Sequence, residues 1–353
     1  MEHIKNIEIK NFKSIRHQTI DDCRRVNVFI GYPNVGKSNI LEAIGLLTYI
    51  RAKRPTGLNG LVRFEKFTQI FNYFNINEPA FINFNDDYSL IIRYEDESAL
   101  NLNLINKKEE FGNNYFGGLR LGKSSIHSTQ IGGTDIFSGS FIELRDFNVR
   151  LYKFSESKDF NKSYSALELS IPFGGNMLEV IINNIEIKKQ FQELLEPYHL
   201  ELIIDRGAEK GSELKISPKK KDGTISTIPI SLLADTLVRL IFFKSAIYSS
   251  KDSVLLFEEP EAHMFPPYIS KFTSDVVYDD RGNQFFIATH SPFVLNDFME
   301  DMDKKDLSVY VVGYKKETGE TIIKRISEDE IEEIYQYGVD LFFNLENYLK
   351  DAV

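Results

Sequence analysis

The stretch GYPNVGKS, Gly31–Ser38, has the G-x-x-x-x-G-K-S spacing of a phosphate-binding loop. The β-branched and aromatic run VNVFI, residues 26–30, precedes it. The run NILEAIGLL, residues 39–47, follows it and is apolar at helical spacing. Because a strand, a glycine loop and a helix are the context in which this pattern holds a triphosphate, the sequence predicts an ATP site here.

The residue types in this loop each suit a phosphate ligand. Two glycines, Gly31 and Gly36, allow backbone angles at which consecutive N–H groups converge on phosphate oxygens. The helix that follows adds unpaired N–H donors and a favourable dipole. We expect Lys37 to reach the β- and γ-phosphates and Ser38 to offer its hydroxyl to Mg²⁺. The expected nucleotide-binding residues of the loop are Gly31, Asn34, Val35, Gly36, Lys37, Ser38 and Asn39.

A second apolar run, VLLF at residues 254–257, ends in the adjacent acids Glu258 and Glu259. Such a run is typical of a central parallel strand. Two carboxylates at its end repel each other and are costly to desolvate, and a magnesium-bound nucleotide offsets that cost. We expect Glu258 to hold Mg²⁺ through water and Glu259 to orient and polarise the attacking water. The alternative is a solvated strand end that is merely acidic.

A third apolar run, QFFIAT at residues 284–289, ends at His290. Its place, at the end of the strand after the acidic one, favours contact between His290 and the γ-phosphate. The residue type by itself favours a structural hydrogen bond instead. Because position is the more specific signal, we assign His290 to the catalytic group together with Lys37 and Glu259.

A helix is predicted over residues 231–248, with Ser231 as its N-cap and Asp235 in its first turns. The N-terminus of such a helix suits a phosphate held by a second subunit, so Ser231 joins the nucleotide-binding candidates. A capped core helix explains the same residues equally well.

Composition narrows the class of protein. The length of 353 residues favours about two to three domains. The single cysteine, Cys23, excludes an internal disulfide, and neither a signal peptide nor a membrane-spanning apolar run is evident, so we expect a cytoplasmic protein without a membrane partner. A net charge of −10 argues against coating DNA through a global field. The basic cluster Lys219–Lys221 reads first as a solvated hairpin turn, although it also suits a phosphate backbone.

Periodicity and turn residues give a coarse map of the remaining chain. We expect an antiparallel β-layer, a long glycine-rich surface loop, one long helix, and a C-terminal hairpin followed by a helix that begins with a capping box. These elements are expected at 79–84, 88–94 and 99–105 (strands), 111–140 (loop), 175–197 (helix), 308–326 (hairpin, turning at Thr318–Gly319) and after Ser327. The predicted divisions are 1–110 and 226–353 for the two parts of an ATPase head, with 111–225 as a loop-rich lid.

The ordered set of motifs resembles the ABC-class ATPases of the SMC/RecF/OLD branch, and in particular the short bacterial AAA-type ATPases grouped with OLD nucleases and phage-defence systems. The motifs are NFKSI (11–15), the phosphate-binding loop, the helix at Ser231, EEPEAH (258–263) and ATHSP (288–292). They cover roughly residues 1–50 and 225–300. The resemblance implies an α/β fold: an ABC-type head with a mixed sheet, an antiparallel β-layer and an α/β lid. The absence of heptads excludes long coiled-coil arms.

The resemblance also implies a function. Two heads would sandwich two ATP molecules as a homodimer or higher homo-oligomer, and hydrolysis would open it. Relatives couple this cycle to DNA or to a separate nuclease or toxin, so we expect an ATPase that regulates such an effector in anti-phage defence.

Two departures keep alternatives open. Leu233 stands where the signature helix normally has glycine, and only Gln69 offers a weak candidate for the magnesium-sensing glutamine. The alternatives are a RecF-like repair ATPase that binds DNA directly and a scaffold that binds ATP without hydrolysing it.

Overall fold

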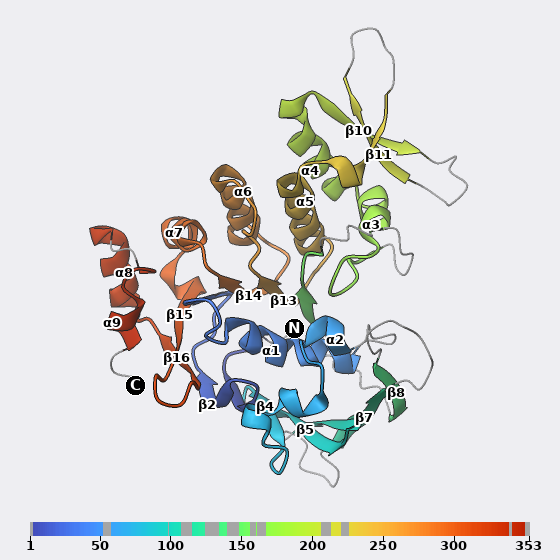
Figure 1. Ribbon diagram of the computed structural model, residues 1–353. Coiled ribbons are helices and arrows are strands. Elements are labelled where there is room, and N and C mark those ends of the chain that lie inside the picture. The colour runs from blue at the N-terminus through green and yellow to red at the C-terminus, as the bar shows by residue number, and fades with distance from the viewer. Residues whose placement is uncertain are drawn as a thin grey trace. The chain divides into compact units, whose positions relative to one another are not determined.

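The strand that leads into the phosphate-binding loop, β3 (Val26–Ile30), lies in the middle of a six-stranded sheet (Figure 1). The computed structural model describes residues 3–51, 58–97, 99–106, 115–123, 134–139, 148–155, 160, 167–205, 213–219, 226–338 and 341–349. The described chain forms two units. The first is Met1–Leu151 with Ser253–Glu259 and Gln284–Val353; the second is Tyr152–Asp252 with Pro260–Asn283.

The six-stranded sheet has the order β16-β15-β3-β14-β13-β9. Its four central strands, β15, β3, β14 and β13, are parallel, whereas β16 runs antiparallel to β15. All side chains of β3 and β14 are buried, which is why both strands read as continuous apolar runs. The bounds are β9 Val149–Tyr152, β13 Val254–Glu258, β14 Gln284–Thr289, β15 Leu307–Tyr314 and β16 Thr321–Arg325. The expected mixed-sheet α/β fold is confirmed.

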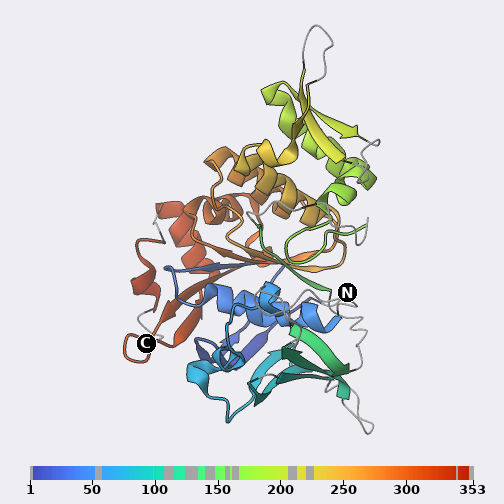
Figure 2. The same ribbon diagram turned by 45° about the vertical axis from the view of Figure 1, so that its right-hand side comes forward.

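Helix α1 (Lys37–Arg51) begins directly at the phosphate-binding loop and packs between two sheets (Figure 2). It contacts β13 and β14 on one side and β1 of the second, seven-stranded sheet on the other. The order of the second sheet is β2-β1-β4-β5-β6-β7-β8, and its neighbours are antiparallel throughout. Its strands are β1 Ile7–Phe12, β2 Ile15–Ile20, β4 Ala80–Phe84, β5 Tyr88–Asp96, β6 Ala99–Asn106, β7 Tyr115–Lys123 and β8 Thr134–Gly139.

The last two of these strands correct the sequence-based expectation. The strands expected near 79–84, 88–94 and 99–105 are confirmed, but the predicted surface loop over 111–140 contains β7 and β8. Glycine lowers the local preference for a strand, yet it does not prevent a ladder of backbone hydrogen bonds to β6. The rest of 107–140 lies outside the described residues.

The C-terminal hairpin is found where it was expected. Strands β15 and β16 pair from Tyr310↔Arg325 to Tyr314↔Thr321, and Gly319 takes a left-handed φ of +67° in the turn. Ser327 and Glu330 form the predicted capping box of α8 (Glu328–Tyr337). The other helical segments of this unit are α2 Leu58–Leu61, η1 Phe67–Ile70, η2 Asn72–Phe74, α7 Pro292–Asp301, η5 Lys304–Asp306 and α9 Leu345–Leu349.

The second unit combines helices with a three-stranded sheet of order β10-β11-β12. Its elements are α3 Met177–Asn183, α4 Ile185–Leu195, η3 Glu196–Tyr198, β10 Leu200–Asp205, β11 Glu213–Pro218, β12 Ile228–Pro229, η4 Ile230–Leu232, α5 Asp235–Tyr248 and α6 Pro266–Val277. The basic cluster is described only at Lys219, whose N–H bonds to the carbonyl of His199 at 2.8 Å. The predicted division into 1–110, 111–225 and 226–353 stays a prediction.

The helix expected over 175–197 is two helices, and Asn184 marks the break. The side-chain oxygen of Asn184 accepts hydrogen bonds from the backbone N–H groups of Glu186 at 3.0 Å and Ile187 at 3.1 Å. An asparagine that bonds the following amides favours a new helix start over continuation of the old helix. The apolar periodicity runs through the break, which is why it predicted one helix.

Among the described residues, no helix combines the length and apolar character needed to cross a bilayer.

Replacing Asn184 with alanine tests the break. Loss of the cap leaves two amides of α4 without their side-chain acceptor, so we expect Asn184→Ala to lower the free energy of unfolding by about 1 kcal/mol in urea titrations. Lys188→Ala, an exposed change in the same helix, is the control and should stay within about 0.5 kcal/mol of the parent. Equal stabilities of the two variants would contradict the cap.

Candidate functional site

The loop between β3 and α1 has the backbone of an anion-binding loop. Asn34 and Gly36 take left-handed φ angles of +64° and +105°, and the N–H of Ile40 bonds to the Gly36 carbonyl at 3.1 Å as α1 begins. Turns of this kind direct successive N–H groups into one concavity. Val35 is buried beneath the loop, whereas Asn34 is exposed and Ser38 and Asn39 are half-buried.

Lys37 is held inside this loop. Its side chain is buried, and its ammonium donates to the carbonyl oxygens of Gly31 and Tyr32, both at 2.9 Å. A buried ammonium needs such acceptors because its desolvation is costly. The loop therefore keeps a cation ready at the position where phosphate charge would arrive.

The second and third strand ends meet this lysine. The ammonium of Lys37 lies 3.5 Å from Nδ1 of His290, and Nε2 of His290 lies 3.2 Å from Oε1 of Glu259. The three predicted catalytic residues, one at the start of α1 and two at strand ends, are thus brought together. The hydrogen bond with His290 lowers the pKa of Glu259; burial opposes this shift, while the charges of His290, Lys37 and Arg63 support it. Glu259 is therefore an ionised acceptor at neutral pH.

The backbone of Glu259 is strained. Its φ is +45°, a left-handed conformation that a residue with a side chain rarely adopts, and its N–H is fixed by the Ala288 carbonyl at 2.9 Å. Such conformations cost about 1–3 kcal/mol and persist where the surroundings enforce them. Here the hydrogen bond to Ala288 in β14 holds Glu259 in such a conformation, and its carboxylate then faces His290.

Sequence reasoning missed a set of charges next to Glu258. The Arg63 guanidinium bonds Glu42 at 2.8 Å through Nε and lies 3.5 Å from Glu258 through a terminal nitrogen. Lys13 also pairs with Glu42, whose carboxylate is fully buried in α1. The sequence offered one signal for these charges: Glu42 lies among the apolar residues of the predicted helix, and a buried carboxylate requires a cationic partner. Arg63 thus balances Glu258, the predicted Mg²⁺ ligand.

Asn39 and the motif residue Ser14 brace the loop from behind. The side-chain amide of Asn39 donates to Oγ of Ser14 at 2.7 Å, and that oxygen lies 2.6 Å from Oγ1 of Thr321 in β16. The Thr321 hydroxyl in turn donates to the carbonyl of Val35 at 2.9 Å. Nothing in the local sequence around Thr321 indicates this role.

Gln69 has a different role from the one considered for it. Its side-chain oxygen accepts from the backbone N–H groups of Glu65 at 2.7 Å and Lys66 at 3.0 Å, which caps the short helix η1. The same residue lines a cavity of about 380 Å³ together with Lys13, Arg63, Phe71, Tyr73 and Phe74. Its carbonyl oxygen is thus committed to the backbone.

The predicted N-cap at Ser231 is wrong. Ser231 lies exposed in the 3-10 turn η4, and α5 begins at Asp235 with Ala234 as its N-cap residue. Leu233 separates the two with an extended backbone at ψ 155°, so the chain cannot enter a helix at Ser231. A serine before an apolar run resembles a cap, but the 3-10 turn comes first.

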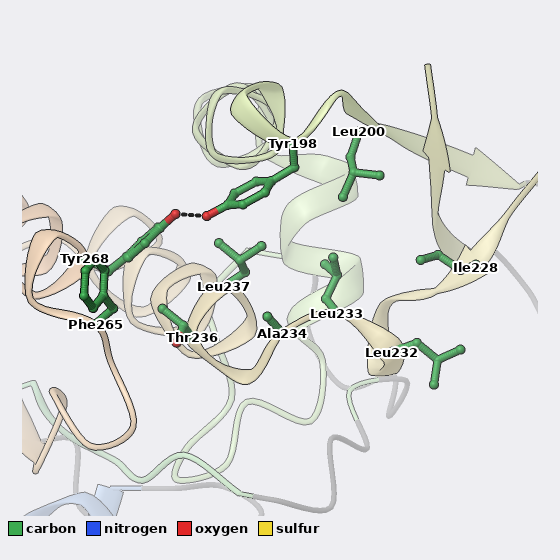
Figure 3. A pocket seen from close by; sticks show the side chains of 10 residues that line it. All are labelled: Tyr198, Leu200, Ile228, Leu232, Leu233, Ala234, Thr236, Leu237, Phe265 and Tyr268. Carbon is green, nitrogen blue, oxygen red and sulfur yellow. Dashed lines mark hydrogen bonds between the residues drawn. The ribbon is translucent and has the colours of Figure 1, made fainter. Parts of the chain in front are cut away.

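Leu233 lines an apolar pocket of about 490 Å³ within the second unit (Figure 3). The exposed side chains of Leu232 and Phe265 stand at this pocket, and the hydroxyl groups of Tyr198 and Tyr268 hydrogen-bond to each other. Large exposed apolar groups are typical of surfaces that contact other molecules. The full lining is Tyr198, Leu200, Ile228, Leu232, Leu233, Ala234, Thr236, Leu237, Phe265 and Tyr268.

The donor set suits magnesium only together with a nucleotide. Among the described residues no group of three or more His, Cys, Asp or Glu side chains is placed to hold a metal ion. Mg²⁺ commonly takes one or two protein oxygens and completes its shell with water and substrate phosphates. The Ser38 hydroxyl at the start of α1 and the Glu258 carboxylate at the end of β13 are oxygen ligands of that kind.

The chain has an α/β P-loop fold similar to that of SMC head domains. A crystal structure of an Smc head bound to the C-terminal winged-helix domain of ScpA is similar over 93% of this chain and 99% of that one, with a TM-score of 0.54 and 13% identity. An Smc head with an extended coiled coil, bound to the C-terminal domain of ScpA from Pyrococcus furiosus, gives a TM-score of 0.51 at 11% identity, over 96% and 99% of the two chains. At these identities the likeness concerns the fold.

The chain belongs to the family described as "AAA domain, putative AbiEii toxin, Type IV TA system", whose model matches residues 26–296. Short stretches also resemble the DNA replication and repair protein RecF. The RecF of Caldanaerobacter subterraneus subsp. tengcongensis is 38% identical over 64 residues, and that of Lactococcus lactis subsp. cremoris is 38% identical over 60. The first match covers 18% of this chain and 18% of its relative, and the second covers 17% of each. The chain therefore spans less than a fifth of the length of these relatives.

Substitution at Glu259 should separate strain from chemistry. Both Glu259→Gly and Glu259→Gln remove the carboxylate, but only glycine relieves the left-handed backbone. We expect the glycine variant to unfold with a free energy about 1 kcal/mol higher than the glutamine variant in urea titrations. Glutamine equal to or more stable than glycine would show that this peptide is unstrained.

The lowered pKa of Glu259 also predicts a pH dependence. A carboxyl group whose pKa is lower when folded binds protons more readily in the unfolded chain, so its stabilisation is complete above the unfolded value and is lost as pH falls through the folded one. We expect the stability difference between the parent and Glu259→Gln to shrink on acidification below the ordinary value of 4.5. Thermal unfolding of both proteins from pH 7 to pH 3 measures it; a constant difference would contradict the pairing.

Proposed function

We propose that this protein is a Mg²⁺-dependent ATPase that dimerises on ATP and regulates a separate effector protein, in the setting of anti-phage defence. One observation carries the enzymatic part: His290 lies between the ammonium of Lys37 and the carboxylate of Glu259. Groups from two strand ends and from the start of α1 lie together at the phosphate-binding loop. A histidine with a purely structural role does not need both an ammonium and a carboxylate as partners.

The residues would divide the reaction between them. The Lys37 ammonium would exchange its carbonyl partners for β- and γ-phosphate oxygens, and loop N–H groups would hold the remaining charge. The ionised Glu259 would orient the attacking water, and His290 would contact the γ-phosphate. Ser38 and Glu258 would hold Mg²⁺, which when bound neutralises phosphate charge. Arg63 would keep Glu258 placed through their 3.5 Å contact.

Dimerisation is proposed from the resemblance to ABC-type heads. Each composite site would take Gly31–Ser38, Glu258, Glu259 and His290 from one head and the segment around Ser231 and Leu233 from the other. The exposed apolar groups beside Leu233 support contact with another molecule there.

An effector is proposed from the family and its neighbours. The family description names a toxin of a type IV toxin–antitoxin system, and the similar Smc heads were solved bound to parts of ScpA. Both descriptions fit a head that acts with a second protein. A nuclease or toxin partner and the OLD-like subgroup follow from the sequence resemblance alone.

Two other functions have specific motives. The RecF-like stretches favour a repair ATPase that binds DNA directly, and ATP-dependent DNA binding that weakens steeply with salt would support it. Leu233 in place of a signature glycine favours a scaffold that holds ATP without turnover.

Turnover and assembly test the main proposal together. We expect Lys37→Ala and Glu259→Gln each to lower ATP turnover about 100-fold or more, because a positioned base such as Glu259 contributes at least that factor and the Lys37 ammonium stabilises charge on the transferred phosphoryl group. Glu259→Gln should still bind ATP and double its mass in solution with ATP and Mg²⁺, measured by light scattering.

The controls make the outcome decisive. Glu300→Gln makes the same chemical change at an exposed acid of α7 and should leave turnover and mass as in the parent. Lys37→Ala should stay monomeric with ATP. A parent protein that binds ATP without turnover would favour the scaffold, and Glu259→Gln that stays monomeric with ATP bound would exclude the ATP-driven dimer.

A further inference from the structure

Both glycines of the G-x-x-x-x-G-K-S pattern in the phosphate-binding loop lie against the C-terminal hairpin β15–β16. A Cβ atom added to Gly31 would lie 2.2 Å from the carbonyl oxygen of Val312 in β15. One added to Gly36 would lie 2.2 Å from Oγ1 of Thr321 in β16. The loop therefore rests on the hairpin at both of its ends.

A directed chain of hydrogen bonds links the hairpin to the loop. Because the Thr321 hydroxyl donates its proton to the Val35 carbonyl, it must accept from the Ser14 hydroxyl 2.6 Å away. Ser14 accepts in turn from the Asn39 amide at 2.7 Å. All donors thus point the same way, toward the Val35 carbonyl.

Backbone contacts keep this chain in register. The N–H of Thr321 donates to the carbonyl of Ser14 at 2.9 Å, and Thr321 is 1% exposed. The hydroxyl therefore has little freedom to turn elsewhere. A buried carbonyl such as that of Val35 would lose its partner if this hydroxyl were removed.

The peptide group that Thr321 grips also belongs to the nucleotide site. The Val35 carbonyl and the Gly36 N–H are parts of one planar trans peptide, so they point in opposite directions. Holding the carbonyl toward Thr321 consequently turns the Gly36 N–H away from the hairpin and into the loop. That N–H is one of the groups expected to bind phosphate.

We propose that Thr321 is a positioning residue of the nucleotide site, which fixes the Val35–Gly36 peptide in the orientation that binds phosphate. The inference rests on the proposed ATP binding at this loop. It assigns part of the site to a hairpin residue that lies 286 positions after Val35 in the sequence.

A matched set of variants tests this role with a fluorescent ATP analogue and Mg²⁺. Thr321→Val keeps the shape but removes the hydroxyl, and we expect the Kd to rise roughly tenfold. Thr321→Ser keeps the hydroxyl and should stay within about twofold of the parent. Thr48→Val is the control, because the buried Thr48 donates a 2.8 Å bond to the Val149 carbonyl, at the opposite end of α1 from the loop.

The control separates positioning from general stability. We expect Thr48→Val and Thr321→Val to lower the melting temperature comparably, while only Thr321→Val weakens nucleotide binding. Parent-like affinity in Thr321→Val, or an equal loss in Thr48→Val, would overturn the proposal. If Thr321→Val does not fold, Thr321→Ala, which also removes the hydroxyl, replaces it with the same expected loss of roughly tenfold; unchanged affinity would then overturn the proposal.

The two proposals fail in different ways. If the parent and Lys37→Ala bind the nucleotide equally poorly, ATP binding itself is wrong. If the parent binds, Lys37→Ala does not, and Thr321→Val binds like the parent, only the role of Thr321 is wrong.

Discussion

The site depends on opposite charges being held at one edge of a parallel sheet, partly out of water. His290 and Glu259 follow the ends of β14 and β13, Lys37 begins α1 after the loop that follows β3, and Lys37, His290 and Glu259 contact one another in that order. Carboxyl ends of parallel strands meet at one edge, so the topology alone brings these groups together. What the sheet cannot supply is the compensation of each charge, and the loop carbonyls around Lys37 and the Arg63 guanidinium near Glu258 supply it.

The rest of the first unit serves this edge as a rigid frame. Helix α1 packs between two sheets, and its fully buried carboxylate, Glu42, forms ion pairs with Lys13 and Arg63. A frame of this kind can hold Glu259 in an unfavourable backbone conformation, because relaxation of that peptide would have to disturb β14. The left-handed backbone of Glu259 therefore depends on the packing of the strands around it.

The sequence was informative where the signal is local and poor where it is distant. The loop, β13 and β14 were predictable because motif and apolar run are contiguous. The strands β7 and β8 were not, because glycine-rich segments become strands only through neighbours along the sheet. The break at Asn184 and the 3-10 turn at Ser231 depend on which side-chain oxygen finds which amide, which periodicity does not report. The contacts of Arg63 with Glu258 and of Thr321 with Val35 join residues far apart in the chain, so no local pattern indicates them.

The position of β3 has a consequence for how the protein is made. The side-chain amide of Asn27 in β3 bonds to a carbonyl 258 residues away, and the neighbours of β3 on both sides, β14 and β15, are synthesised long after it. During synthesis the phosphate-binding loop is therefore made before the strands that flank β3. The nucleotide site can therefore close only after β15 has been made, so a translation product that stops before β14 would carry the phosphate-binding loop without the strands that flank it.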